Sequence, residues 1–149
     1  MNAQRGNFVL LRAGALRLLL AQPEVGAAEY LEPPPVPTAV AGLLRSADPQ
    51  DRRVHVALSE QLTPLPACPP GRFVGCELAG GEMPLVWCWD ELRVLIDLNF
   101  EPIAIPAALL AEGSVVTHYA QVDGAPVFIC SAQALCARVL QPSEGEHAA

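Results

Sequence analysis

Prolines most strongly limit what this chain can fold into, because fifteen of them interrupt its 149 residues. Five lie in QPEVGAAEYLEPPPVP (22–37) and four in TPLPACPPGR (63–72). Proline has no backbone N–H and a fixed φ, so neither segment can form a long helix or a central strand. We expect a short edge strand over 24–31, an extended link after it, and a loop over 63–72.

Alternating apolar residues and short turn motifs predict hairpins in the remaining segments. FVLLRAGALRLLL (8–20) divides at Ala13-Gly14 into two strands joined by a turn. Gly80-Gly81 and Asp123-Gly124 are two-residue hairpin signals, because both backbone positions of such turns favour a positive φ. We therefore expect one hairpin within 73–96 and another within 115–130.

Two segments also predict which side chains share a face of a strand, because successive side chains alternate. RVHVALSEQL (53–62) is expected to be a half-buried strand followed by a single turn, with two opposed sets of side chains: Val54, Val56 and Leu58, against Arg53, His55 and Ala57. PLVWCWDEL (84–92) divides in the same way: Leu85, Trp87 and Trp89, against Val86, Cys88 and Asp90.

Helices are expected to be few and short. Thr38 is a candidate cap for a helix over 39–45, and 107–113 is expected to form a helical turn that ends at Gly113. SAQALCARVL (131–140) predicts an amphipathic helix, with Ser131 as its N-cap. Its expected apolar face consists of Ala132, Leu135, Cys136, Val139 and Leu140.

The number of short strands predicts a mainly β fold. We count about eight to ten strands between Gly and Pro turns, a pattern typical of small antiparallel barrels. The proline-rich segment 63–72 is the expected seam between two barrels. We expect a single domain over 1–141 and a frayed tail over 142–149.

Charge and cysteine content exclude several classes of protein. The net charge is −7, so nucleic acid is not an expected partner, because its binding needs clustered cations. The five cysteines are odd in number and form no CxxC motif, which indicates reduced thiols in a cytoplasmic protein. Arg12 and Arg17 interrupt the apolar segment 8–20, so neither a signal peptide nor a membrane span is expected.

No pattern of residues predicts an active site or a cofactor. The cysteines and histidines are too widely spaced for a structural zinc site, so no metal is expected. Cys130 and His118 are a possible nucleophile and base, but Cys130 follows an apolar strand, where a thiol is inert. Asp90 and Glu91 are neighbours on a strand and point to opposite faces, which prevents them from acting as an acid–base pair.

Trp87 and Trp89 leave two interpretations open. The pair can be a platform for a small ligand, or it can belong to a core or an interface, which is the more frequent role of such a pair. The ligand interpretation is retained as the alternative function, a small-ligand-binding β-barrel that uses the Trp87/Trp89 region.

The order of these segments resembles that of CheW-like domains, the adaptor modules of bacterial chemosensory arrays. LRLLL (16–20) with Glu24-Val25, PVPTAVAGLL (35–44), VHVAL (54–58) and LVWCWDEL (85–92) match successive parts of the family pattern. Residues 101–140 match its close: an extended proline segment, a hairpin, an aliphatic strand and a helix. The family's Asn-Leu-Arg-Gly is absent after Gly42-Leu43-Leu44, where Arg45 and SADPQDRR stand instead.

The resemblance implies two five-stranded SH3-like barrels that share an apolar core, with short helices and a C-terminal helix. It implies a non-catalytic adaptor without cofactor, metal or obligatory small molecule, not inserted in a membrane. The implied partners are a methyl-accepting chemoreceptor and a CheA-type histidine kinase, in chemotaxis or in type IV pilus twitching motility. The partner-binding residues that it implies are Glu24, Val25, Gly42, Arg45, Arg52 and Arg53. The other polar residues of 46–53 are expected to form a solvated turn.

Overall fold

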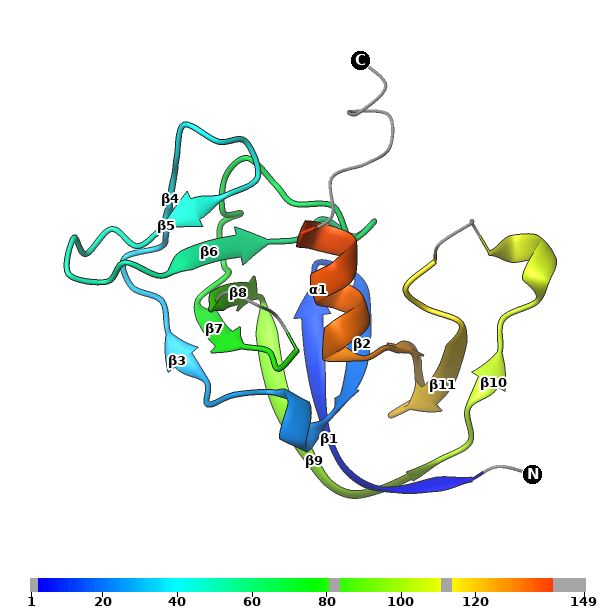
Figure 1. Ribbon diagram of the computed structural model, residues 1–149. Helices are drawn as coiled ribbons and strands as arrows, with labels where there is room; N and C mark the ends of the chain where they lie inside the picture. Colours follow the sequence, from blue (N-terminus) through cyan, green and yellow to red (C-terminus); the bar gives the residue numbers. More distant parts are fainter. Residues whose placement is uncertain (1–2, 81–83, 111–113, 141–149) are drawn as a thin grey trace.

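Two six-stranded sheets form most of the molecule (Figure 1). The computed structural model describes residues 3–80, 84–110 and 114–140. Within these ranges there is one α-helix, and two short 3-10 helices accompany it. The expectation of a mainly β fold is confirmed. No helix in the described part of the chain is long and apolar enough to cross a membrane.

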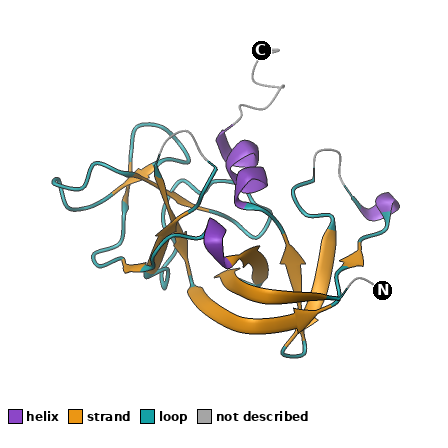
Figure 2. Cartoon of the chain, turned by 60° about the horizontal axis from the view of Figure 1, so that its bottom comes forward, coloured by secondary structure: helices purple, strands orange, loops and turns teal. Residues whose placement is uncertain are grey.

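The first sheet is built from the two ends of the described chain. Its strands lie in the order β10-β11-β12-β2-β1-β9. Their bounds are β1 (Gln4–Ala13), β2 (Leu16–Ala21), β9 (Glu91–Phe100), β10 (Ile103–Ala104), β11 (His118–Val122) and β12 (Ala125–Ile129). The long strands β1 and β9 pair along almost their whole length, and Figure 2 shows how strongly the long strands curve.

The second sheet is built from the residues between β2 and β9. Its strands lie in the order β3-β7-β8-β6-β5-β4. Their bounds are β3 (Glu29–Tyr30), β4 (Val36–Pro37), β5 (Leu44–Arg45), β6 (Val54–Ala57), β7 (Val74–Glu77) and β8 (Leu85–Trp89). The short strands β3 and β4 lie at the two edges, where proline-rich sequence is tolerated.

The predicted hairpins form where the turn residues indicated. Gly14 joins β1 to β2 with a φ of 61°, and β11 and β12 meet at Asp123 and Gly124, with φ of 52° and 77°. Strands β7 and β8 are antiparallel, and Gly80 after β7 has a φ of 92°. Gly81, the second residue of the predicted turn, lies outside the described residues.

Each sheet also contains one parallel pair, which corrects the expectation of purely antiparallel barrels. Strand β12 pairs with β2 in the first sheet, and β6 pairs with β8 in the second. Twelve strands are described, more than the eight to ten expected. Residues 63–72 connect strands of one sheet, because β6 precedes them and β7 and β8 follow. A division of the chain into two parts at that loop stays a prediction.

Three local predictions were wrong in the first half of the chain. Strand β6 is buried on both faces instead of half-buried, because His55 and Ala57 are at most 1% exposed. Residues 39–45 form a turn and strand β5 instead of a helix. The Thr38 hydroxyl donates to the Leu43 carbonyl (2.7 Å), and its oxygen accepts from the Val40 N–H (3.1 Å), which closes the turn. Residues 24–31 form no continuous strand: a 3-10 helix, η1 (Gln22–Glu24), comes first, followed by an isolated bridge at Val25 and then β3.

Helix α1 (Ala132–Leu140) confirms the prediction for the last described segment. The Ser131 hydroxyl accepts a hydrogen bond from the Ala134 N–H at 3.1 Å, as expected of an N-cap. The short helix η2 (Ala107–Leu109) lies where a helical turn was expected, while Gly113 is outside the described residues.

One apolar core joins the two sheets and the helix. It contains Leu18 of β2, Val56 of β6, Trp87 and Trp89 of β8, and Leu135 of α1, all at most 1% exposed. Val86 and Cys88 lie on the opposite face of β8, in a second cluster on the outer face of the second sheet. Strand β8 is therefore buried on both faces.

Candidate functional site

Glu24 and Val25, which were expected to contact a partner, make contacts within the chain. The Glu24 carboxylate accepts a hydrogen bond from the Ala132 N–H at 2.8 Å, at the beginning of α1. Val25 pairs with Leu78 and packs against the shared core. Both side chains are only partly exposed. The carboxylate accepts from an amide that has no partner within the helix, and its negative charge interacts favourably with the helix dipole.

Gly42, another expected partner contact, lies in a tight turn that requires a glycine. It is buried and has a φ of 89°, a conformation that L side chains rarely adopt. A Cβ built on it would lie 3.0 Å from the Cβ of Pro64. The glycine therefore allows the turn before β5 to approach the proline-rich loop closely.

Arg45 and Arg52 are the expected partner contacts that the structure leaves at the surface. Both side chains are exposed, and neither makes an ion pair with another residue of the described part of the chain. Arg45 lies on β5, opposite Val54 of β6, and Arg52 lies just before β6. The two cations therefore flank the same edge region of the second sheet.

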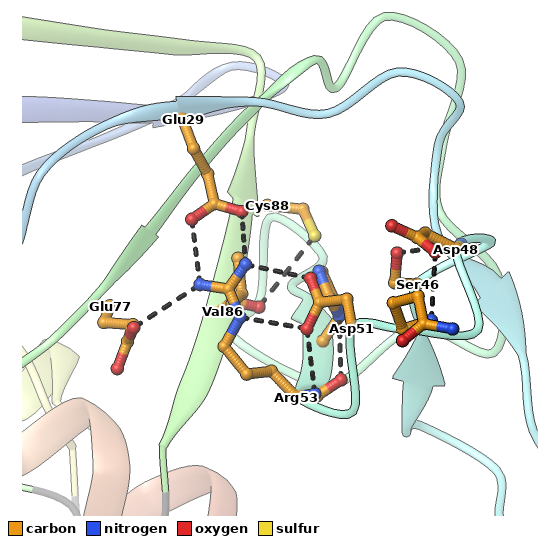
Figure 3. A network of polar contacts seen from close by, with 10 residues as sticks. Glu29, Ser46, Asp48, Asp51, Arg53, Glu77, Val86 and Cys88 are labelled. Atoms are coloured by element: carbon orange, nitrogen blue, oxygen red, sulfur yellow. Dashed lines mark hydrogen bonds and ion pairs between the residues drawn. The ribbon is translucent and has the colours of Figure 1, made fainter.

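Arg53, by contrast, is held inside a network of carboxylates. Its guanidinium donates to Glu29 at 2.7 and 2.9 Å and to Asp51 at 2.9 and 3.1 Å. A longer contact of 3.4 Å reaches Glu77. Figure 3 shows the guanidinium surrounded by these three carboxylates, which come from β3, the loop before β6, and β7. These bonds occupy Arg53 within the chain.

The network shifts the pKa values of its members. Hydrogen bonds from Arg53 lower the pKa of Asp51 to about 2. The bonds to Asp51 and Glu29 raise the pKa of Arg53 further above its ordinary value. Asp51 is therefore a carboxylate, and Arg53 a cation, throughout the neutral range.

His55 lies beside this network and is almost completely buried. Its side chain belongs to β6 and is 1% exposed. Its Nδ1 lies 3.2 Å from the Arg53 carbonyl, which can only accept a hydrogen bond, so Nδ1 carries the proton. Burial lowers the pKa of His55, which favours the neutral ring with a lone pair on Nε2.

Glu29, Asp51 and His55 converge on one small cavity. One carboxylate oxygen of each acid and one ring nitrogen of the histidine all lie within 4.8 Å of one another. The three side chains line a cavity of about 160 Å³, whose wall also contains Glu32 and Asp48. Sequence spacing missed this group, because Glu29 lies on β3 and the other two lie on or just before β6.

The loop between β5 and β6 closes the cavity as a turn held by its own side chains. Ser46 accepts from the Asp48 N–H at 3.1 Å, and the Asp48 carboxylate accepts from the Gln50 N–H at 2.9 Å. Such side-chain contacts stabilise turns without regular backbone pairing. Asp48 and Gln50 are exposed, in keeping with the solvated turn expected for this loop.

Cys130 and His118 line another cavity, of about 450 Å³, but they do not form a nucleophile–base pair. The described hydrogen bond of His118 joins its Nδ1 to the hydroxyl of the neighbouring Thr117, at 2.9 Å. Burial raises the pKa of the Cys130 thiol to about 12, so the thiol is protonated at neutral pH. A protonated, buried thiol is a poor nucleophile.

The remaining candidate residues have structural contacts. Trp87 and Trp89 are 1% and 0% exposed within the shared core, so neither indole offers a surface to a ligand. Asp90 accepts from the Gly14 N–H at 2.6 Å and pairs with the buried Arg72 at 3.3 Å. Glu91 pairs instead with Arg12, at 3.4 Å. The two acids therefore act separately, as their alternation predicted.

No family model and no curated protein matches the chain.

Proposed function

We propose that the protein is a non-catalytic adaptor that couples a chemoreceptor to a CheA-type histidine kinase. In this proposal its two sheets correspond to the two SH3-like barrels of a CheW-like domain. The pathway is chemotaxis or type IV pilus twitching motility, and the protein acts in the cytoplasm.

The order of elements supports the proposal most directly. The chain begins with an apolar hairpin, continues through a proline-containing link and a glycine turn to β6, and ends its described part with the β11–β12 hairpin and α1. This is the order that the CheW-like resemblance implies, apart from the short helix expected over 39–45.

Exposed apolar side chains at two sheet edges are compatible with a protein that binds other proteins. Tyr30 and Phe73 are 68% and 43% exposed, and their rings lie 6.1 Å apart beside the edge strand β3. Val94 and Ile96 are 45% and 66% exposed on β9, an edge strand of the first sheet. Aromatic and aliphatic side chains of this kind are enriched in interfaces.

Arg45 and Arg52 are the residues that we assign to partner recognition. They are exposed cations on an otherwise acidic protein, and no described carboxylate neutralises them. An acidic surface on the kinase or the receptor would be attracted to them during encounter.

A binding experiment tests the proposal. The wild-type protein is expected to bind the regulatory domain of a chemosensory histidine kinase, or a receptor signalling tip, from the same cell. The double variant Arg45→Glu/Arg52→Glu should bind about tenfold more weakly, because charges at an interface rim contribute about 1 kcal/mol. Calorimetry or surface plasmon resonance measures both affinities.

Arg138→Glu is the matched control. Arg138 is an exposed cation on α1, outside the strand and loop that carry Arg45 and Arg52, and its reversal should leave the affinity unchanged. Equal weakening by Arg138→Glu would show that net charge matters instead of the assigned residues. Absence of binding between the wild-type protein and every chemosensory kinase and receptor of that cell would reject the adaptor function.

The small-ligand alternative finds no support in the tryptophans on which it was based. Both indoles lie in the core, where a ligand can reach them only by displacing packed side chains. A metabolite screen that left tryptophan emission unchanged would agree with this position, whereas a saturable change would restore the alternative.

A further inference from the structure

We propose that Glu29, Asp51 and His55 form a binding site for a divalent transition-metal ion of the Zn²⁺ class. The site is independent of the adaptor function, and nothing in the sequence pattern predicted it. It rests on the convergence of three ligand atoms, the orientation of a buried histidine, and the local charge.

The three ligand atoms are close to the spacing that a metal needs. They lie within 4.8 Å of one another, whereas tetrahedral ligands at about 2.1 Å from zinc are roughly 3.4 Å apart. Rotations of two partly exposed carboxylates can remove the difference, because Glu29 and Asp51 are not locked in a packed core. The fourth position would face the cavity of about 160 Å³ and be filled by water.

The hydrogen bond of His55 leaves Nε2 as the ring atom that can ligate a metal. Its Nδ1–H donates to the Arg53 carbonyl, and such a bond from the distal ring nitrogen is what fixes the tautomer of metal-ligating histidines. No hydrogen-bond partner for Nε2 occurs among the described residues, and the residue as a whole is only 1% exposed. A ring acceptor beside two carboxylates, which are also acceptors, can bind a cation.

The charged groups at the site have a net negative charge that a divalent cation would neutralise. Glu29, Asp51 and Glu77 carry three negative charges, and Arg53 neutralises one of them. Two negative charges therefore remain uncompensated. Glu32 and Asp48 line the same cavity and add further negative potential. The site therefore favours a doubly charged ion over a single ammonium group.

Arg53 is both a support and a competitor for the ion. Each carboxylate oxygen has two lone pairs, so Glu29 and Asp51 can hold the guanidinium on one side and a metal on the other. The positive guanidinium nevertheless repels a metal ion at this distance. Replacing it with a neutral side chain should therefore strengthen metal binding, which an ordinary salt-bridge network would not show.

The donor set selects the class of metal. One imidazole nitrogen with two carboxylate oxygens suits Zn²⁺ and neighbouring first-row ions, whereas Mg²⁺ and Ca²⁺ prefer an all-oxygen shell. Zn²⁺ is therefore the probe ion, and Mg²⁺ is the comparison ion.

The experiment is a Zn²⁺ titration of the full chain by calorimetry, in reducing buffer, with folding checked by circular dichroism. The wild-type protein is expected to bind one Zn²⁺ at this site and to bind Mg²⁺ at least tenfold more weakly. Glu29→Gln and Asp51→Asn keep the shape of each side chain and should each weaken Zn²⁺ binding at least tenfold. Arg53→Gln should tighten it several-fold.

Two control variants separate this site from other donors. His118→Gln alters an exposed histidine outside the site, and Cys68→Ser removes the only partly exposed thiol among the described residues. Both should bind Zn²⁺ like the wild type. The proposal is overturned if folded Glu29→Gln and Asp51→Asn keep wild-type affinity, if Cys68→Ser abolishes binding, or if the wild-type protein binds no Zn²⁺ at micromolar concentration.

Discussion

Cys68 and Cys130 show how strongly position in the fold changes one side chain. Cys68 is partly exposed in the loop after β6, and a hydrogen bond with Cys88, aided by the charge of Arg72, lowers the pKa of its thiol. Burial raises the pKa of Cys130 from 9.0 to about 12. The raised pKa leaves Cys130 with a far smaller thiolate fraction at neutral pH than an ordinary cysteine has.

Alkylation should therefore distinguish the two thiols. We expect iodoacetamide at pH 7.5 to modify Cys68 first and to leave Cys130 unmodified in the native protein, as peptide mass spectrometry would report. Denaturant should make all five cysteines reactive, which is the control for complete labelling. Modification of Cys130 at the rate of Cys68 in the native protein would contradict its burial.

At the scale of elements, the beginning of α1 depends on a residue far away in the sequence. Two of its first amides are satisfied by side chains, the Ala132 N–H by Glu24 and the Ala134 N–H by Ser131. Glu24 therefore ties the end of η1 to the helix across 108 positions.

Glu24→Ala should lower the free energy of unfolding by about 1 kcal/mol, since a helix loses one of its capping acceptors. Glu24→Gln keeps an acceptor oxygen and should recover most of that loss. Urea denaturation followed by circular dichroism measures both. Glu101→Ala, on an exposed residue after β9, is the control, and a loss of similar size there would show that the effect is not capping.

Elements set by local chemistry could be predicted from the sequence. The Asp123-Gly124 hairpin follows from two residues that accept a positive φ, and α1 follows from its apolar spacing and Ser131. The helix predicted over 39–45 was wrong because it relied on Thr38 as a cap. A threonine hydroxyl can stabilise a tight turn as well as a helix N-terminus, and here it does the former. The parallel pairs of β2 with β12 and of β6 with β8 could not be predicted, because they depend on contacts between distant segments.

The candidate metal site shows the same limit. Asp51 and His55 are only four positions apart in the sequence, so their proximity is local. Glu29 joins them only because β3 pairs with β7, β7 with β8, and β8 with β6, which places the edge strand near the loop before β6. The resemblance implied that Arg53 contacts a partner protein. Its carboxylate partners within the chain could not be predicted, because they lie in three separate segments.

At the scale of the whole molecule, one core serves both sheets. Leu135 of α1 is 0% exposed and packs in the cluster that contains Leu18 of the first sheet and Trp87 of the second. Loosening this cluster should therefore affect both sheets together.

Leu135→Ala should lower the free energy of unfolding by about 3 kcal/mol, as expected for a buried leucine. Tryptophan emission reports on β8, and far-ultraviolet circular dichroism reports on all strands. Both signals should move to the same lower denaturant midpoint. Leu109→Ala, at a side chain that is 76% exposed, should change neither midpoint. Two separate transitions would show that the sheets unfold independently.

The pairing of β2 with β12 has a consequence during synthesis. The apolar β1–β2 hairpin is made early, but its sheet neighbours β9 and β12 and the covering helix α1 follow only after the whole second sheet has been translated. On the ribosome, the apolar side chains of LRLLL (16–20) therefore stay uncovered until the segments that pack against them have been translated. The nascent chain is expected to need shielding by a chaperone over that interval, and to fold only when its last strand and helix emerge.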